Sequence, residues 1–390
     1  MTDNNYINIQ YKNVLINSTI TYYLQFVLII GLFYLVPALQ FIFFQTKSHV
    51  VTCYYNNLCN KKLENLNGFN NVISNVSYII LGLLFIITVR LKKTRQTEDI
   101  RNNLGIYENK SLYYSLGVSF IFEGLCSATY HLCPSKLNLQ FDTTFMFVCI
   151  SLILLILYHK RNMGNICHPL KFYLLIFLVI LLNTLSLIDN KTSIQLWIWA
   201  VTFLFVCYCI ISLTLYVYIG INVEFNMEYI NTAWNIAKNE KFIKNPRFWL
   251  ILIIDTFTIS MCVYAGLTAP YYTDWILFIS IVNLVIYFIY YLFIKYINNE
   301  TINNYIKIAL GVDTITGIAS LYFYFNTNYN TLLPINESNK LNEHCILLNY
   351  FDNHDLWHLL SAITLYIFMN IILFIDYDID GNIREILTLL

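Results

Sequence analysis

The stretch LKFYLLIFLVILLNTLSLI, residues 170–188, contains a single charged side chain, Lys171, close to its start. A helix of about 20 mostly apolar residues is long enough to cross the hydrocarbon core of a bilayer, which is about 30 Å thick. Inside lipid the backbone must satisfy its own hydrogen bonds, and a helix does so within one segment. The stretch therefore predicts a membrane-spanning helix.

The same apolar pattern recurs along the whole chain. Of the 390 residues, 58% are hydrophobic and only 12% are charged, whereas a soluble domain carries about 25% charged residues. The alternation typical of a lipid-facing barrel strand is absent. We therefore predict an all-α polytopic membrane protein with about ten transmembrane helices and no sizeable soluble domain. The expected spans are residues 21–44, 72–91, 112–132, 143–158, 170–188, 194–219, 248–269, 275–297, 305–325 and 356–375. The membrane domain would cover residues 21–376, between a short cytoplasmic N-terminus (1–20) and a cytoplasmic tail (377–390).

Lysine and arginine predict how these spans are oriented, because cytoplasmic loops are enriched in both. The loops after the even-numbered spans are the richer ones, so we expect these loops and both termini to be cytoplasmic. The odd-numbered loops would face the exterior or an organelle lumen. A plasma membrane or a lysosome-like organelle fits this arrangement. The basic residues concerned are Lys92, Lys93, Arg95, Arg101, Lys110, Lys160, Arg161, Lys171, Lys238, Lys241, Lys244, Arg247, Lys295 and Lys307.

Cysteines and glycosylation sequons give the same orientation. Of the ten cysteines, Cys53, Cys59, Cys133 and Cys345 fall in the odd-numbered loops. On an oxidising side such a set forms two disulfides, and the sequence leaves three pairings open, or some free thiols. The sequons Asn190-Lys-Thr and Asn336-Glu-Ser lie on the same side and predict a glycoprotein.

Residues 225–237 predict an amphipathic helix on the cytoplasmic surface, or else a polar linker.

The residues most suited to chemistry lie at the expected outer ends of three spans. Three of the seven histidines are found there: His131, His354 and His358. A spacing of four places His354 and His358 on one helical face, one turn apart, and the same spacing pairs Ser127 with His131. Asp142 lies at the expected start of the fourth span. The orientation derived from lysine and arginine puts all these side chains at one membrane level.

Three imidazoles with one open position are typical of a catalytic zinc site. We expect His131, His354 and His358 to bind Zn²⁺. Bound zinc lowers the pKa of its water to about 7 and polarises a carbonyl. Asp142 would orient or deprotonate that water, or bind the metal itself, and Ser127 would hydrogen-bond the substrate or Asp142. The predicted reaction is hydrolysis of a lipid amide or ester bond.

Each of these residues also has a simpler interpretation. A histidine at the end of a span is often an interfacial anchor, Ser127 alone fits helix packing, and Asp142 alone fits an N-cap. Glu123 lies one turn before Ser127 and either supports the site or lines a polar cavity. Asp255 and Asp313 lie inside expected spans, where they either mark a transport path or stay protonated and hydrogen-bonded between helices.

Long stretches of the chain resemble the transmembrane region of the SID (systemic RNA interference-defective) family, also called cholesterol uptake proteins. The similarity extends in order and spacing from residue 34 to residue 380. The matching stretches are CYYNNLC (53–59), FNNVISN (69–75), EGLCSATYHLCP (123–134), QFDTTFM (140–146) and CILLNYFDNHDLWH (345–358). The family is similar to a wider group of membrane hydrolases, which includes alkaline ceramidases and progestin/adiponectin-type receptors. In that group one Ser, one Asp and three His surround zinc, positions that Ser127, Asp142, His131, His354 and His358 fill here.

The resemblance implies two competing functions. The wider group implies zinc-dependent hydrolysis of ceramide-like or phospholipid substrates, which is our main prediction. The alternative is a transporter of double-stranded RNA, of cholesterol, or of both, in which zinc only joins three helices. A receptor that uses the same site as a ligand pocket is a third interpretation.

One departure from the family pattern bears on the choice of partner. The resemblance implies a large β-rich extracellular domain and a first span ahead of the matching region. We expect this chain to be either a short paralogue without them, which weakens the RNA interpretation, or an incomplete gene model. The expected outer loops offer only scattered lysines, whereas binding RNA phosphates needs a cluster of them. Membrane lipids, including cholesterol, are therefore the expected partners, with double-stranded RNA as the alternative, and a homodimer is the expected assembly.

Overall fold

The computed structural model describes residues 3–48, 53–64, 66–92, 109–161, 168–188, 192–219, 246–268, 271–326 and 328–377. These residues are almost entirely helical, and the described part of the chain contains no strand beyond isolated bridges. Every expected span coincides with a helix. Seven helical stretches are long and apolar enough to cross a membrane, which confirms a polytopic all-α membrane protein. The expected amphipathic helix at residues 225–237 and the sequon at Asn190 lie outside the described residues.

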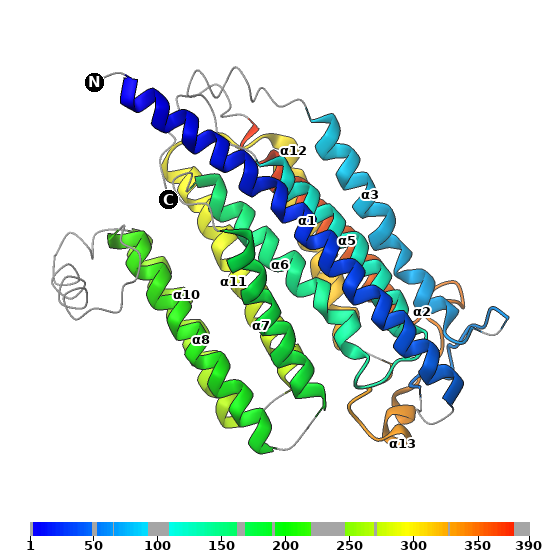
Figure 1. Cartoon of the computed structure of the whole chain (residues 1–390). Helices are drawn as coiled ribbons and strands as arrows, with labels where there is room; N and C mark the ends of the chain where they lie inside the picture. Colours follow the sequence, from blue (N-terminus) through cyan, green and yellow to red (C-terminus); the bar gives the residue numbers. More distant parts are fainter. Residues whose placement is uncertain are drawn as a thin grey trace. The chain divides into compact units, whose positions relative to one another are not determined.

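The helices run back and forth beside one another in chain order (Figure 1). They are α1 (Asp3–Ser48), α2 (Phe69–Ser74), α3 (Val76–Leu91), α5 (Lys110–His131), α6 (Leu139–Arg161), α7 (Pro169–Ile188), α8 (Thr192–Ile219), α10 (Pro246–Thr268), α11 (Tyr272–Ile297), α12 (Asn304–Phe325), α13 (Ile335–Ser338) and α14 (Asn353–Phe374), with a 3-10 turn at Asn339–Leu341.

Two compact units make up the chain. The first contains Met1–Ile180 and Lys295–Leu389, and the second contains Leu181–Ile294. In the first unit, α5 packs against α1, α3 and α6, while α14 packs against α3 and α12. In the second, α8 packs against α10, and the Thr273 hydroxyl donates to Asn183 Oδ1 at 2.6 Å. All the expected site residues belong to the first unit.

Helix α5 occupies an expected span but is not among the seven apolar stretches. Its polar side chains Ser115, Ser119 and Glu123 are buried between neighbouring helices, so the helix has no need of an apolar surface all round. The neighbours also come very close, because a Cβ on Gly124 would lie only 2.8 Å from the Asn75 carbonyl oxygen. This close packing fixes the position of the following turns of α5, which carry Ser127 and His131.

Several helix ends differ from those expected. Helix α6 begins at Leu139, so Asp142 lies within its first turn and not at an N-cap. Helix α14 begins at Asn353, so His354 and His358 are both helical. Helix α1 continues to Asp3, beyond the apolar part that hydropathy detects. These shifts arise because helix ends depend on capping and tertiary contacts as much as on hydropathy.

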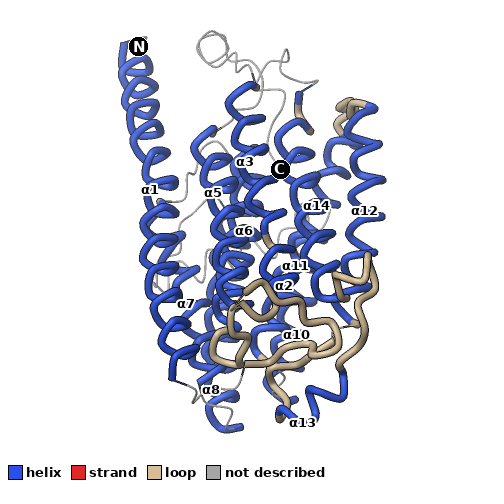
Figure 2. Tube along the Cα trace, turned by 90° about the vertical axis from the view of Figure 1, so that its right-hand side faces the viewer, coloured by secondary structure: helices blue, strands red, loops and turns tan. Residues whose placement is uncertain are grey.

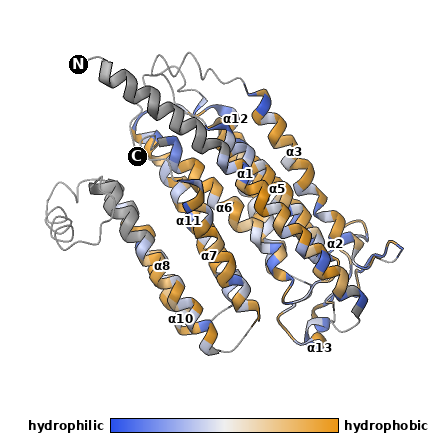
Figure 3. Cartoon of the chain, viewed as in Figure 1, coloured by the Kyte–Doolittle hydropathy of each residue, from blue (hydrophilic) through white to orange (hydrophobic). Residues whose placement is uncertain are grey.

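Two disulfides connect the loops at one end of the first unit. Cys53 is bonded to Cys133 and Cys59 to Cys345, which resolves the pairing that the sequence left open. Loops and the short helix α13 gather at this end (Figure 2), which we call the disulfide end. Hydrophilic residues concentrate there, whereas the long helices are coloured mainly as apolar (Figure 3).

The opposite end of the first unit contains a buried group of charges. Asp376, just after α14, binds Lys160 Nζ at 2.9 Å and Lys295 Nζ at 3.0 Å. Lys295 also binds Glu300 at 3.0 Å, and Lys92 donates to the Leu373 carbonyl at 2.6 Å. The sequence suggested that Lys160 and Lys295 were loop residues. They lie instead in the last turns of α6 and α11, and both are buried in ion pairs.

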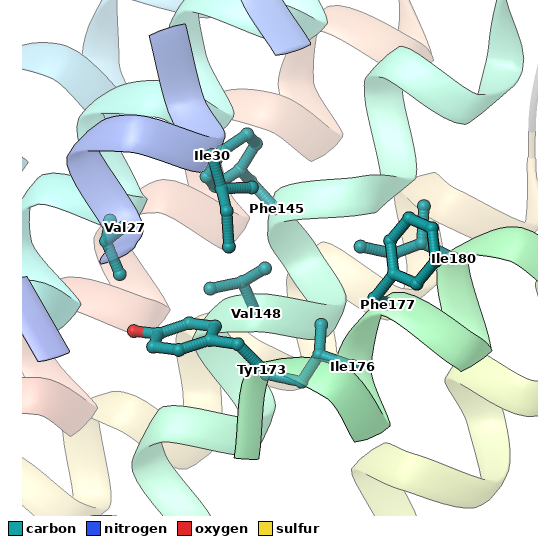
Figure 4. A pocket seen from close by; sticks show the side chains of 8 residues that line it. All are labelled: Val27, Ile30, Phe145, Val148, Tyr173, Ile176, Phe177 and Ile180. Carbon is teal, nitrogen blue, oxygen red and sulfur yellow. The ribbon is translucent and has the colours of Figure 1, made fainter. Parts of the chain in front are cut away.

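An apolar crevice lies between α1, α6 and α7 (Figure 4). It encloses about 60 Å³ and its lining exposes only apolar surface, because the Tyr173 hydroxyl donates to the Tyr23 carbonyl at 3.1 Å. The crevice therefore offers packing surface for hydrocarbon but no catalytic group. Its lining side chains are Val27, Ile30, Phe145, Val148, Tyr173, Ile176, Phe177 and Ile180.

Candidate metal centre

Four of the expected site residues converge at the disulfide end of the helices. His131 of α5, Asp142 of α6, and His354 and His358 of α14 each place one ligand atom within 4.8 Å of the others, and all four side chains are buried. His358 Nε2 lies 3.0 Å from His131 Nε2 and 2.9 Å from His354 Nε2. Asp142 Oδ1 lies 4.0 Å from His131 Nε2. Segments from three different helices therefore meet at one point.

The donor set fits a metal ion better than it fits hydrogen bonding among the imidazoles. His358 Nε2 faces two other Nε2 atoms, and a neutral imidazole has one donor and one acceptor nitrogen. If all three Nε2 atoms pointed lone pairs at one another, the lone pairs would repel. A cation at their centre would accept all three lone pairs. Zinc binds histidine nitrogen at about 2.0–2.1 Å, so nitrogens placed tetrahedrally around it lie about 3.3 Å apart. The observed separations are close to that value.

The start of α14 holds its two histidines in place through a capping box. The Asp352 carboxylate accepts from the Asp355 amide at 3.0 Å, and Asp355 Oδ2 accepts from the Asp352 amide at 3.1 Å. Two amides from elsewhere in the chain complete the arrangement. Asn56 donates to Asp352 at 3.0 Å, and Asn70 donates to Asp355 at 2.7 Å. The cap therefore ties α14 both to α2 and to the disulfide-bonded loop.

Replacing Asp352 with alanine is expected to lower the free energy of unfolding by about 1–2 kcal/mol, because the first turn loses its cap. Metal affinity should fall as well, since His354 lies in that first turn. Asn303→Ala is the matched control, because Asn303 caps α12, where its side chain accepts from the Tyr305 amide. Thermal unfolding and zinc titration in detergent measure both effects. Equal zinc affinity in the two variants would contradict a positioning role for the α14 cap.

Helix α5 presents Glu123, Ser127 and His131 on one face, as their spacing of four predicts. The Ser127 hydroxyl donates to Asp142 Oδ1. The structure thus shows the contact with Asp142 that was one of the two roles expected for this serine. Glu123 is buried, and its Oε2 has no hydrogen-bond partner among the described residues. Asp255 and Asp313 lie on α10 and α12 and are not part of this cluster.

Two tyrosines that the sequence did not single out lie against the cluster. Tyr329 OH is 3.3 Å from His131 Nδ1, and Tyr78 OH is 3.4 Å from His358 Nδ1. Burial raises the pKa of the Tyr329 hydroxyl well above its ordinary value, so this group stays neutral. Tyr78 resembles any other aromatic residue in an apolar span, and Tyr329 lies in a loop. Neither position carried a sequence signal for this role.

A family model described as "dsRNA-gated channel SID-1" matches residues 3–389. The chain belongs to the SID-1 family. SID1 transmembrane family member 1 of Mus musculus is 28% identical over 377 residues, covering 92% of this chain and 45% of the relative. Cholesterol uptake protein 1 of Caenorhabditis elegans is 29% identical over 383 residues, covering 92% of this chain and 49% of the relative.

This SID-1-family chain spans about half the length of the curated relatives it matches. The match confirms the resemblance seen in the five sequence stretches. The names of the model and of the relatives refer to double-stranded RNA and to cholesterol. They therefore favour the transport interpretation over the hydrolysis that the sequence led us to predict first.

Proposed function

We propose that this chain is a membrane transport protein that carries double-stranded RNA or a sterol, and that a zinc ion joins α5, α6 and α14 at the disulfide end. The observation that carries the proposal is the match to the SID-1 channel family along residues 3–389. His131, Asp142, His354 and His358 would hold the ion. Zinc supplies a strong, directional link between helices that pack mainly through dispersion in lipid.

The two cargoes are supported by different observations. The family description supports RNA, while the name of the Caenorhabditis elegans relative supports cholesterol. The apolar crevice between α1, α6 and α7 encloses only about 60 Å³, so it could contact part of a lipid chain but is too small to hold a whole sterol. Among the described residues of the disulfide end, the exposed or half-buried lysines are Lys47, Lys61, Lys62, Lys136 and Lys340, of which only the adjacent pair Lys61 and Lys62 shares a segment. Phosphate binding is strengthened by clustered cations.

Uptake in cells that lack other family members tests the proposal. Cells expressing the chain receive labelled double-stranded RNA in one arm and a fluorescent sterol in the other, with empty-vector cells as the baseline. Uptake of at least one cargo above that baseline is expected. A His131→Ala, His354→Ala double variant at equal surface expression should transport less, because three helices lose their common link. Baseline uptake of both cargoes by the wild-type chain would overturn the proposal.

Lipid hydrolysis is the second candidate, and one contact favours it. The carboxylate of Asp142 lies beside His131 and is held there by the Ser127 hydroxyl. Zinc, when bound, polarises a substrate carbonyl and favours ionisation of water at neutral pH. Asp142 would accept the proton of the attacking water, and Ser127 would keep the carboxylate oriented. The substrate class would be a ceramide-like amide or a phospholipid ester.

Fatty acid release by the purified protein separates the two candidates. Ceramide and phosphatidylcholine are supplied in detergent, and wild type is compared with Asp142→Asn and Ser127→Ala. A hydrolase should lose most turnover in Asp142→Asn, since general-base catalysis contributes about 10²- to 10⁴-fold. Absence of fatty acid from a zinc-loaded wild-type sample would rule this candidate out and leave the structural role of the metal.

A further inference from the structure

The two tyrosines beside the histidine cluster contact the ring nitrogens that point away from the metal position. His131 and His358 direct Nε2 toward the other ligands, and direct Nδ1 toward the hydroxyls of Tyr329 and Tyr78 respectively. Both tyrosines are buried, at 6% and 3% exposure. They come from unrelated parts of the chain, since Tyr78 belongs to α3 and Tyr329 to the loop before α13.

This geometry bears on which tautomer each histidine adopts. A neutral imidazole that binds a metal through Nε2 carries its proton on Nδ1. A buried Nδ1–H needs an acceptor, and metal-binding histidines nearly always have one. The phenol oxygen of a tyrosine can accept such a hydrogen bond while donating its own proton elsewhere.

The surroundings of Tyr78 allow one consistent assignment of hydrogen bonds. The Ser361 hydroxyl donates to the His358 carbonyl at 3.3 Å. Its oxygen is then free to accept from the Tyr78 hydroxyl, which lies 2.5 Å away. Tyr78 has thereby used its proton, and its oxygen accepts from His358 Nδ1–H at 3.4 Å. Each proton is used once, and the Nε2 lone pair of His358 is left for a cation.

His354 differs from the other two histidines. Among the described residues its only hydrogen-bonding contact is through Nε2, to His358. Its ring packs against the rings of Tyr329 and Trp357, with centroids 5.2 and 5.1 Å away. It is also the most exposed of the three, at 9%. Packing, and not a hydrogen bond to Nδ1, therefore holds this ligand.

We propose that Tyr78 and Tyr329 are positioning residues of the metal centre, which fix His358 and His131 as Nδ1-protonated tautomers and so present two Nε2 lone pairs to a divalent cation such as zinc. The inference rests on the proposed zinc site. It assigns Ser361 a part as well, because this residue determines the direction in which the Tyr78 proton points.

Zinc affinity of the full-length protein tests the inference. Protein stripped with a chelator is titrated with zinc in the presence of a chromogenic competitor. Tyr78→Phe and Tyr329→Phe should each weaken binding about 10- to 100-fold, the effect typical of removing a hydrogen-bond partner of a metal ligand. Tyr55→Phe is the matched control: it also removes a tyrosine hydrogen bond, at 2.7 Å to the Leu132 carbonyl next to His131, but not from a ring nitrogen.

Two further measurements distinguish positioning from a merely structural role. Ser361→Ala should weaken zinc binding although Ser361 contacts no histidine ring, because Tyr78 is then free to donate its proton to His358 Nδ1. Nitrogen NMR of ¹⁵N-histidine-labelled, zinc-loaded protein should show His131 and His358 bound through Nε2 and protonated on Nδ1, with the Nδ1–H in a hydrogen bond. In Tyr329→Phe and Tyr78→Phe the Nδ1–H signal of the affected histidine should shift as its hydrogen bond is lost, whereas a loss of stability alone would leave that signal unchanged.

The outcomes separate this inference from the proposed function. Wild-type protein that binds no zinc would overturn both the metal site and the role of the tyrosines. Wild-type protein that binds zinc while Tyr78→Phe, Tyr329→Phe and Ser361→Ala bind it equally well would overturn the inference alone. If one phenylalanine variant fails to fold, the other and Ser361→Ala still decide the question.

Discussion

Replacing His358 with alanine is expected to abolish zinc binding. His358 Nε2 lies within 3.0 Å of the Nε2 atoms of both other histidines, so it is the central member of the ligand set. The variant loses a direct ligand of the metal. Its zinc affinity should therefore fall by more than the roughly 100-fold seen when a ligand only loses its hydrogen-bond partner. Metal analysis of purified protein should show about one zinc per chain in wild type and almost none in the variant.

Unfolding experiments give a second readout for His358→Ala. A ligand that binds only the folded state stabilises it by about 2.7 kcal/mol when its free concentration is 100 times its dissociation constant. Chelation should therefore lower the melting temperature of wild type and leave that of the variant unchanged. His344→Ala is the control, because His344 is an exposed histidine in the loop that precedes α14. Zinc retained by His358→Ala would contradict the assigned ligand set.

Replacing Asp376 with alanine is expected to destabilise the fold by about 3–5 kcal/mol, the cost typical of breaking a buried ion pair from one side. Asp376 is the shared partner of Lys160 and Lys295, whose side chains are 2% and 0% exposed. Without it, Lys160 loses its ion pair with Asp376, and Lys295 loses one of its two carboxylate partners and keeps Glu300. Thermal or denaturant unfolding in detergent measures the change.

Two further variants test the reason for the Asp376 effect. Glu300→Gln should cost much less, because Lys295 keeps Asp376 as a partner. Removing the buried charges together, as Lys160→Met, Lys295→Met, Asp376→Leu and Glu300→Gln, should recover most of the lost stability, since packed apolar side chains often replace buried ion pairs without loss. An Asp376→Ala variant as stable as wild type would show that these lysines find water or other partners.

Much of the fold follows from hydropathy, because lipid requires continuous helical spans. Every expected span is helical, and the i, i+4 spacings correctly grouped Ser127 with His131 and His354 with His358. The helix ends were less predictable. The start of α14 depends on a capping box that Asn56 and Asn70 complete from far away in sequence, and hydropathy carries no record of such contacts.

The rest of the site could not be predicted because it depends on contacts between distant segments. The disulfide pairing is one example, since four cysteines in loops allow three pairings. Lys160 and Lys295 are another, because a lysine at the end of a span indicates orientation whether it reaches water or turns inward to Asp376. Tyr78 and Tyr329 were missed for the same reason, as only the fold brings their hydroxyls to the histidine rings.

Helix α14 is fastened at both of its ends. Its 22 residues extend for about 33 Å at the usual rise per residue. The capping box completed by Asn56 and Asn70 holds the end that carries the histidine pair, while Asp376, just beyond the other end, is held by Lys160 and Lys295. A cation bound by the two histidines would therefore act on the same continuous helix that ends beside the buried charges around Asp376, with no loop between the two places.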